Sequence, residues 1–301
     1  MSAPVHRRRP NPTSLFPAPV PAVRDAVRDL RTLAGGIDHP ECVAWYDGRV
    51  WCGTEAGDLL AIDPASGVVE TVAHPGGFIA GIAFDRRGRC WICDVAGGRV
   101  VRMDRDGRLE VVVDAVGGRR LASPNYPAVA GDGSVWIADS GTRWGADDGF
   151  LFRVRPDDAA VLVDDSCRRF PNGIALSAGE DQLYLVESRL PGIVSYALAP
   201  DGIGERRELL LMPGTVPDGL ALDAAGCLYI GCWRPDRIYR LHPDGSVDVF
   251  LDDPTAEYLN SPTNMAFGGD GRRLYISGLC GWAITEIDVT APGRLLPGSA
   301  T

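Results

Sequence analysis

A short pattern that recurs six times along the chain constrains the fold more than any other feature of the sequence. In each copy an apolar run leads into a Gly- or Asp-containing turn and then into a second run that carries an aromatic residue. Two short apolar runs joined by such a turn are typical of a β-hairpin. The aromatic residues lie 40 to 48 positions apart, at Trp51, Trp91, Trp136, Tyr184, Tyr229 and Tyr275.

This period predicts a ring of blades. Repeats of ~40–50 residues built from short strands are typical of a β-propeller with four strands in each blade. The sixth copy has no run that could serve as its outer strand, whereas a matching run at residues 28–33 precedes the first copy. We therefore expect an all-β fold, a six-bladed β-propeller with four-stranded blades, closed by an N-terminal strand that leaves no open sheet edge. Residues 23–33 are also compatible with a short helix.

Composition indicates a turn-rich chain, and the six repeats make it one domain rather than two. The chain has 37 glycines and 23 prolines in 301 residues, which is above average usage and below that of low-complexity chains. These residues punctuate many short elements. We expect residues 26–301 to form a single propeller domain and residues 1–25 to form a proline-rich N-terminal extension.

Charge and hydropathy exclude several classes of partner. The net charge is −10, and the only cluster of basic residues is Arg7-Arg8-Arg9, whereas nucleic-acid binding requires clustered cations. No apolar run approaches the ~20 residues of a membrane span, and no signal-peptide segment follows the N-terminal arginines. We expect a cytoplasmic protein with a small-molecule partner, no nucleic acid and no membrane; the oligomeric state stays open.

The eight cysteines are expected to be buried thiols. Cys90 and Cys93 have the spacing of a zinc knuckle, but they lie in a strand pattern, where residues three apart point to opposite faces. They therefore cannot bind one ion together, although the sequence leaves a disulfide open.

Polar residues stand at the start of most of the innermost runs. The first strand of each blade lines the central channel, so equivalent positions around the ring converge on one point. Carboxylate and amide oxygens without histidine or cysteine suit a hard cation such as Ca²⁺. Taken singly, Asn172-Gly173 and Asp218-Gly219 are typical turn pairs; taken together, the set predicts a metal site. Its positions are Glu41, Ala80, Asn125-Tyr126, Asn172, Asp218 and Asn264.

Five motifs around these positions resemble one family. In order and spacing, the chain from about Gly36 to Pro297 resembles the SMP-30/gluconolactonase/luciferin-regenerating-enzyme-like family of six-bladed propellers. The motifs are His39-Pro-Glu41, Ser123-Pro-Asn125 and the segments 170–177, 216–223 and 261–269. The resemblance implies that Glu41, Asn172 and Asp218 hold a divalent metal, with Asn125 contacting metal or substrate. It also implies lactone hydrolysis, with Asp218 as the general base.

This chemistry is physically reasonable for a metal-dependent hydrolase. A cation polarises the lactone carbonyl and acidifies water, and an adjacent carboxylate accepts the proton. The chain has no Gly-x-Ser-x-Gly nucleophile motif, and its four histidines show no triad-like context. Ca²⁺ is the expected cation, with Mg²⁺, Mn²⁺ and Zn²⁺ as alternatives.

Two departures from the family pattern concern the substrate. Asn125-Tyr126 stands where many members have Asn-Asp, and the Arg that several members carry near Ser123 is absent. Both changes point toward a less polar, even aromatic, lactone ring. Asn125, Tyr126, Asn264, Trp144 and Arg143 are the candidate substrate-binding residues. Asp139-Ser140 and Glu187-Ser188 occupy corresponding positions in their repeats and are expected to be structural.

Two other classes of function remain alternatives. The segment Cys52–Glu55, and Asp139-Ser140 followed by residues 149–153, are similar to strictosidine-synthase-like propellers, which perform condensation chemistry. The same scaffold could also support a ring-opening, dehydration or isomerisation step. The third class is a binding propeller without catalytic activity. The intact Glu41/Asn172/Asp218 set favours the metal-dependent lactonase.

Overall fold

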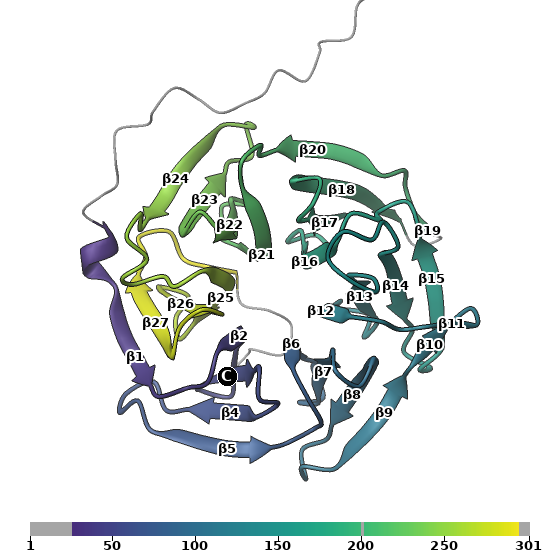
Figure 1. Ribbon diagram of the computed structural model, residues 1–301, viewed down its shortest axis with the longest axis horizontal. Coiled ribbons are helices and arrows are strands. Elements are labelled where there is room, and N and C mark those ends of the chain that lie inside the picture. Colours follow the sequence, from purple (N-terminus) through teal and green to yellow (C-terminus); the bar gives the residue numbers. More distant parts are fainter. Residues whose placement is uncertain (1–25, 200–201, 295–301) are drawn as a thin grey trace, which may run out of the picture.

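Each sequence repeat forms one antiparallel sheet, and six such sheets surround a central axis (Figure 1). The computed structural model describes residues 26–199 and 202–294, so the extension predicted for residues 1–25 lies outside the described residues. The six-bladed propeller with four-stranded blades is confirmed. In the described part of the chain, no helix is long and apolar enough to cross a membrane.

The blades follow one another in chain order. The first blade consists of β2 (Pro40–Tyr46), β3 (Arg49–Thr54), β4 (Leu59–Ile62) and β5 (Val69–Ala73). The second consists of β6 (Ile79–Phe84), β7 (Cys90–Asp94), β8 (Arg99–Met103) and β9 (Leu109–Val113). The third consists of β12 (Pro124–Val129), β13 (Val135–Asp139), β14 (Phe150–Val154) and β15 (Ala160–Asp164). The fourth blade consists of β16 (Pro171–Leu176), β17 (Gln182–Glu187), β18 (Gly192–Ala199) and β20 (Arg207–Leu211). The fifth consists of β21 (Val216–Leu222), β22 (Leu228–Arg234), β23 (Arg237–Leu241) and β24 (Val247–Asp252). The sixth consists of β25 (Pro262–Gly268), β26 (Arg273–Gly278), β27 (Ala283–Asp288) and the N-terminal strand β1 (Arg31–Gly35). Short elements outside the blades are η1 (Ala26–Asp29), β10 (Ala115–Val116) and β11 (Arg119–Arg120). In the fourth blade, the short strand β19 (Gly202–Ile203) also pairs with the end of β18.

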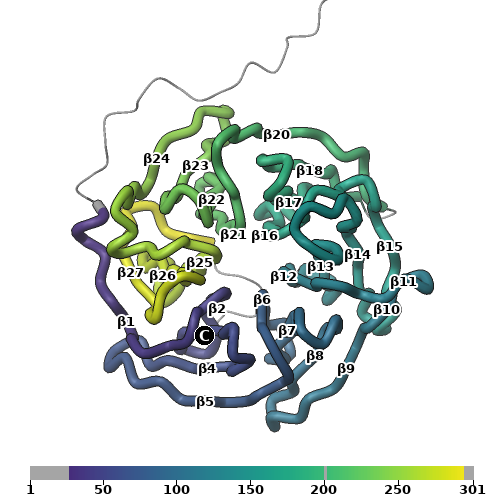
Figure 2. Tube along the Cα trace, in the orientation of Figure 1, coloured from purple at the N-terminus to yellow at the C-terminus, as the bar shows by residue number. Residues whose placement is uncertain are grey.

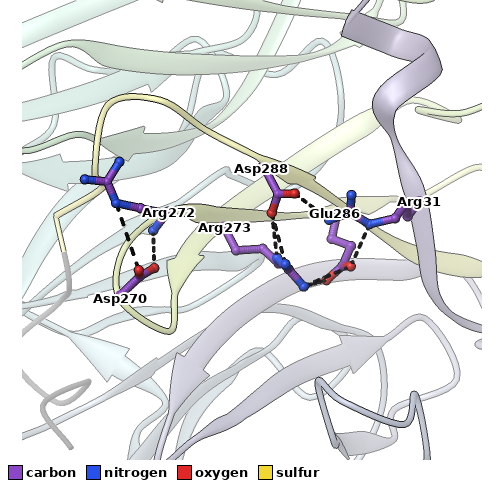
Figure 3. Close-up of polar contacts among 6 residues, drawn as sticks. All are labelled: Arg31, Asp270, Arg272, Arg273, Glu286 and Asp288. Atoms are coloured by element: carbon purple, nitrogen blue, oxygen red, sulfur yellow. Dashed lines mark hydrogen bonds and ion pairs between the residues drawn. The ribbon is translucent and has the colours of Figure 1, made fainter.

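The N-terminal strand closes the ring, as predicted. β1 pairs antiparallel with β27 and becomes the outer strand of the sixth blade (Figure 2). The side chains reinforce this pairing, because Arg31 on β1 and Arg273 on β26 share the carboxylates of Glu286 and Asp288 on β27 (Figure 3). The strand begins at Arg31, three residues later than the predicted run, because Ala26–Asp29 form a 3₁₀ helix. Both interpretations of this segment were therefore correct in part.

The core lies between neighbouring blades. The repeated aromatic residues stand on the second strand of each blade, and Trp91, Tyr229 and Tyr275 are at most 2% exposed. Neighbouring blades bury these rings jointly; Trp91, for example, packs in one cluster with Val135 and Phe152 of the third blade. The repeat that reveals the fold is therefore the repeat that holds the blades together.

All eight cysteines lie within the described residues and are free thiols, so the disulfide left open by the sequence is absent there. Seven are buried, as predicted, and Cys280 is exposed. Cys90 and Cys93 pack into different inter-blade clusters on opposite faces of their sheet, which confirms that they cannot share an ion.

Candidate metal and active site in the central channel

A β-bulge interrupts every inner strand at the position of the predicted ligand. The pairing of each inner strand with its second strand gains one extra residue there, for example between Pro40 and Cys42 or between Pro171 and Ile174. A bulge bends the strand and redirects side chains. The residues within the bulges include Glu41, Ala80, Asn125, Asn172, Asp218 and Asn264. We call the end of the channel where they lie the ligand end.

The Asn-Gly and Asp-Gly pairs do not form turns. Asn172-Gly173 lies within β16 and Asp218-Gly219 lies within β21, so the turn interpretation of these pairs was wrong. Neither glycine has a positive φ. A Cβ on Gly173 would stand 2.6 Å from the Asp218 carbonyl oxygen, and one on Gly219 would stand 2.3 Å from Asn264 Oδ1. Glycine is required because neighbouring inner strands approach too closely for a side chain.

Backbone strain precedes three of the inner strands. His39, Phe170 and Ser261 have φ values of 40°, 61° and 61°, and each stands directly before the proline that begins an inner strand. Non-glycine residues rarely adopt this left-handed conformation, and strain of this kind clusters at functional sites. Three residues at the ligand end therefore hold a backbone conformation that is unfavourable for their residue types.

Five oxygens at the ligand end are buried without a hydrogen-bond partner. Among the described residues only six buried side-chain nitrogen or oxygen atoms lack a partner, and the sixth is Nε of Arg153, outside the channel strands. The five oxygens are Glu41 Oε2, Asn125 Oδ1, Asn172 Oδ1, Asp218 Oδ1 and Asn264 Oδ1. Buried polar atoms are normally paired, so five unpaired acceptors in one ring of positions suit an electropositive ligand.

The two carboxylates of this set face an electrostatic conflict. Burial raises the pKa of Asp218 to about 7, and a hydrogen bond with Asn172 opposes this shift. Burial and the nearby charge of Asp218 raise the pKa of Glu41 well above its ordinary value. No hydrogen bond or ion pair in the described structure brings a positive side chain to either orphaned oxygen. A bound cation would remove the conflict.

The donor set fits a hard divalent cation. It contains carboxylate and amide oxygens only, the ligands that Ca²⁺ and similar ions prefer. The described residues contain no cluster of three or more His, Cys, Asp or Glu that could hold a metal. That finding agrees with the channel set, in which Glu41 and Asp218 are the only acids and amides complete the ring. Glu41, Asn172 and Asp218 are the residues that would hold the ion, with Asn125 and Asn264 beside them.

Hydrogen bonds direct the amide oxygens into the channel. Asn125 Nδ2 donates to Ser140 Oγ at 3.1 Å, and Asn172 Nδ2 donates to Ser188 Oγ at 3.3 Å. Asn264 Nδ2 donates to the carbonyl oxygen of Glu41 at 3.1 Å. Sequence reasoning gave the two serines no part in the site. Their matching places in two repeats, directly after Asp139 and Glu187, were the signal that could have found them.

The other predicted substrate-binding residues lie at different depths. Trp144, 54% exposed, packs edge-on against Phe170 with ring centroids 4.8 Å apart, which places it on the rim of the ligand end. Arg143 beside it is exposed. Tyr126 is instead buried in the cluster that joins the third and fourth blades. The structure therefore brings Asn125 and Asn264 to the ligands and Trp144 and Arg143 to the rim. Tyr126 lies in the core, where it also lines the apolar cavity of the channel.

The opposite end of the channel is apolar. All six inner strands contribute to a cavity of about 50 Å³ there. Its side chains include Trp45, Phe84, Leu176, Leu222 and Phe267. Arg294 adds the one charged group among its lining residues, pairs with Glu180 at 3.7 Å and donates to the carbonyl oxygen of Leu176. We call this the apolar end.

Comparison with known proteins gives concordant matches. The family described as the SMP-30/gluconolactonase/LRE-like region matches residues 39–279. A gluconolactonase of Zymomonas mobilis is 27% identical over 84% of this chain and 81% of its own length. A 6-deoxy-6-sulfogluconolactonase of Pseudomonas putida is 30% identical over 79% of this chain and 82% of its own.

A solved structure supports the same fold. The calcium-binding protein regucalcin of Agrobacterium tumefaciens superimposes with a TM-score of 0.73 at 18% identity, covering 90% of this chain and 97% of that one. At this identity the likeness concerns the fold alone. The family match covers residues 39–279 and agrees with the repeat, the six-bladed ring and the motifs at the inner strands. The chain therefore belongs to the SMP-30/gluconolactonase/LRE-like family.

Proposed function

We propose that the protein is a divalent-metal-dependent lactonase, a hydrolase that opens a small lactone ring at the ligand end of the channel. The five orphaned oxygens carry this proposal, because they are buried acceptors that suit a cation and no positive side chain pairs with them. The names of the two sequence relatives, gluconolactonase and 6-deoxy-6-sulfogluconolactonase, support the lactonase activity. Ca²⁺ is the expected cation, and a cytoplasmic location is part of the same proposal.

Each residue of the site would have a distinct role in this reaction. A bound divalent cation would polarise the lactone carbonyl and stabilise the negative charge that develops on its oxygen. Glu41, Asn172 and Asp218 would hold the cation. Asp218 would also accept the proton from the attacking water through a carboxylate oxygen. Asn125 would contact the cation or the substrate, and Asn264 would orient the substrate.

The side chains at the rim favour a less polar substrate than a sugar lactone. Ala80 supplies no polar group from the second blade, so the ring of ligand positions lacks a polar side chain there. Trp144 rests on Phe170, and Trp282, 57% exposed, packs against His39 with ring centroids 4.6 Å apart. These two aromatic pairs would flank a ring that enters the channel, and Arg143 would contact it from the rim.

A chelator experiment tests the proposal. The purified protein is stripped with chelator, and ring opening of a gluconolactone and of an aromatic lactone such as dihydrocoumarin is followed by proton release. We expect no turnover after stripping, recovery on adding Ca²⁺, Mg²⁺, Mn²⁺ or Zn²⁺, and a preference for the aromatic lactone. Turnover that persists without any divalent cation would contradict the metal-dependent mechanism.

A further inference from the structure

Two buried serines connect the amide ligands to the next blade. Ser140 directly follows β13 and is 0% exposed, and Ser188 directly follows β17 and is 2% exposed. Ser140 Oγ donates to the carbonyl oxygen of Pro171 at 2.7 Å, and Ser188 Oγ donates to that of Pro217 at the same distance. Pro171 and Pro217 belong to the inner strands of the following blades. Each serine therefore joins its own blade to the next one at the ligand end.

The hydrogen of each hydroxyl determines how the neighbouring amide must point. A carbonyl oxygen can only accept, so each serine gives its single hydroxyl hydrogen to the proline carbonyl. Its Oγ then offers lone pairs only, and the asparagine beside it must present its NH₂ group. Asn125 at 3.1 Å and Asn172 at 3.3 Å do so. Their Oδ1 atoms are consequently turned away from the serines and remain without a partner.

In the sixth blade, the amide of Asn264 is oriented without an intervening serine. Asn264 Nδ2 donates directly to the Glu41 carbonyl oxygen, which also accepts from Thr263 Oγ1 at 2.7 Å and Ser277 Oγ at 2.9 Å. Here too an atom that can only accept fixes the amide. Three asparagines on three blades thus hold their oxygens inward, and in each case the cause is a hydrogen bond on the far side of the amide.

We propose that Ser140 and Ser188 are positioning residues that hold Asn125 and Asn172 with their oxygens toward the cation, by giving their hydroxyl hydrogens to the next blade. This inference rests on the proposed function. Without the hydroxyl, the asparagine can rotate by half a turn and present its NH₂ group, which repels a cation. Groups that orient metal ligands typically contribute about 10–100-fold to metal affinity.

The test measures cation affinity rather than turnover. Calorimetric titration of Ca²⁺ into chelator-stripped protein compares wild type, Ser188→Ala, Asn172→Asp and the double variant. We expect Ser188→Ala to weaken Ca²⁺ binding about 10–100-fold. An aspartate has two equivalent acceptor oxygens and needs no orientation, so in the Asn172→Asp background the serine substitution should change the affinity less than about 3-fold. The same cycle applies to Ser140 and Asn125.

A matched control separates orientation from the loss of any buried hydroxyl. Ser134 is also 0% exposed, and its Oγ donates to Asp132 at 2.6 Å, away from the channel ligands. Ser134→Ala should leave the Ca²⁺ affinity unchanged. If Ser188→Ala does not fold, Ser188→Cys keeps the volume and weakens both hydrogen bonds, so the cycle is repeated with it.

The outcomes are distinguishable. Absence of Ca²⁺ binding by wild type would overturn the proposed function and this inference with it. Binding by wild type that Ser188→Ala leaves unchanged would overturn the inference alone. An equal loss of affinity in the wild-type and Asn172→Asp backgrounds would also overturn it, because the serine would then act on the fold rather than on the amide.

Discussion

The two ends of the central channel are built from the same six strands and have opposite character. At the ligand end every inner strand is bulged, and the buried side chains carry oxygens without partners. A few residues further along, the same strands pair regularly with their neighbours and bury apolar side chains around the cavity. In β25, for example, Asn264 and Phe267 are three residues apart.

Within each inner strand, the residues at one end therefore serve the proposed function and the residues at the other end stabilise the fold. Apolar side chains at one end contribute burial, which is the main favourable contribution to folding. At the other end, buried carboxylates and strained backbone oppose folding and persist because the surrounding ring fixes them. Changes at the ligand end should therefore affect chemistry, and changes at the apolar end should affect the free energy of unfolding.

The largest effect is expected for Asp218→Ala. Loss of a ligand and general base should lower kcat/KM for the lactone at least about 10²-fold and abolish cation binding. The metal-free variant should be as stable as the metal-free wild type or more stable, because a buried carboxylate without a cationic partner is removed. Kinetics and thermal unfolding without metal check both parts. A strongly destabilised metal-free variant would show that Asp218 supports the fold.

At the apolar end, Phe267→Ala should produce the reverse pattern. Phe267 is 4% exposed and packs against Tyr229, with ring centroids 5.4 Å apart. Its truncation should lower the free energy of unfolding by about 3–5 kcal/mol. The Ca²⁺ affinity of the folded fraction should stay within about 3-fold of wild type. Denaturant titration and calorimetry measure the two quantities, and a lost cation site would erase the distinction between the ends.

Removal of the cation should destabilise the folded protein, and this effect should depend on the residues of the ligand end alone. Because the ion binds the folded state only, a concentration 100-fold above Kd should stabilise wild type by about 2.7 kcal/mol. Thermal unfolding with and without chelator measures this shift. Phe267→Ala should retain the shift and Asp218→Ala should lose it. An equal response in both variants would mean that the cation acts elsewhere.

The smallest effect is expected far from the channel. Arg31 is 48% exposed and pairs with Glu286 and Asp288 where the ring closes (Figure 3). Arg31→Ala should lower the free energy of unfolding by about 0.2–1 kcal/mol, because its ion pair with Asp288 is exposed and the buried Glu286 keeps its ion pair with Arg273. Activity and Ca²⁺ affinity should not change. A loss of several kcal/mol in a denaturant titration would show that this pair is essential to ring closure.

The sequence predicted the ring and the places of its ligands because both depend on a repeat. The aromatic residues mark the second strands, and the prolines before Glu41, Asn125, Asn172 and Asp218 mark the inner strands. Burial of the cysteines followed from residue type and strand pattern, although Cys280 is exposed. These features are local, or they are repeated often enough to be recognised without the fold.

Features that depend on a neighbouring blade could not be predicted in the same way. Gly173 and Gly219 suggested turns, but the reason for glycine is the adjacent inner strand. Ser188 acts through the Pro217 carbonyl, 29 residues away in the sequence. Tyr126 was placed beside the substrate because it follows Asn125, but the bulge at this position leaves its ring in the core. Its substrate role stays a prediction.

The claim that the orphaned oxygens form a cation site is tested most directly by calorimetric titration of Ca²⁺ into chelator-stripped wild type and Asp218→Ala. The account predicts one cation for each wild-type chain and no binding by the variant, with both proteins folded by circular dichroism. Absence of binding by wild type, or equal binding by the variant, would contradict it.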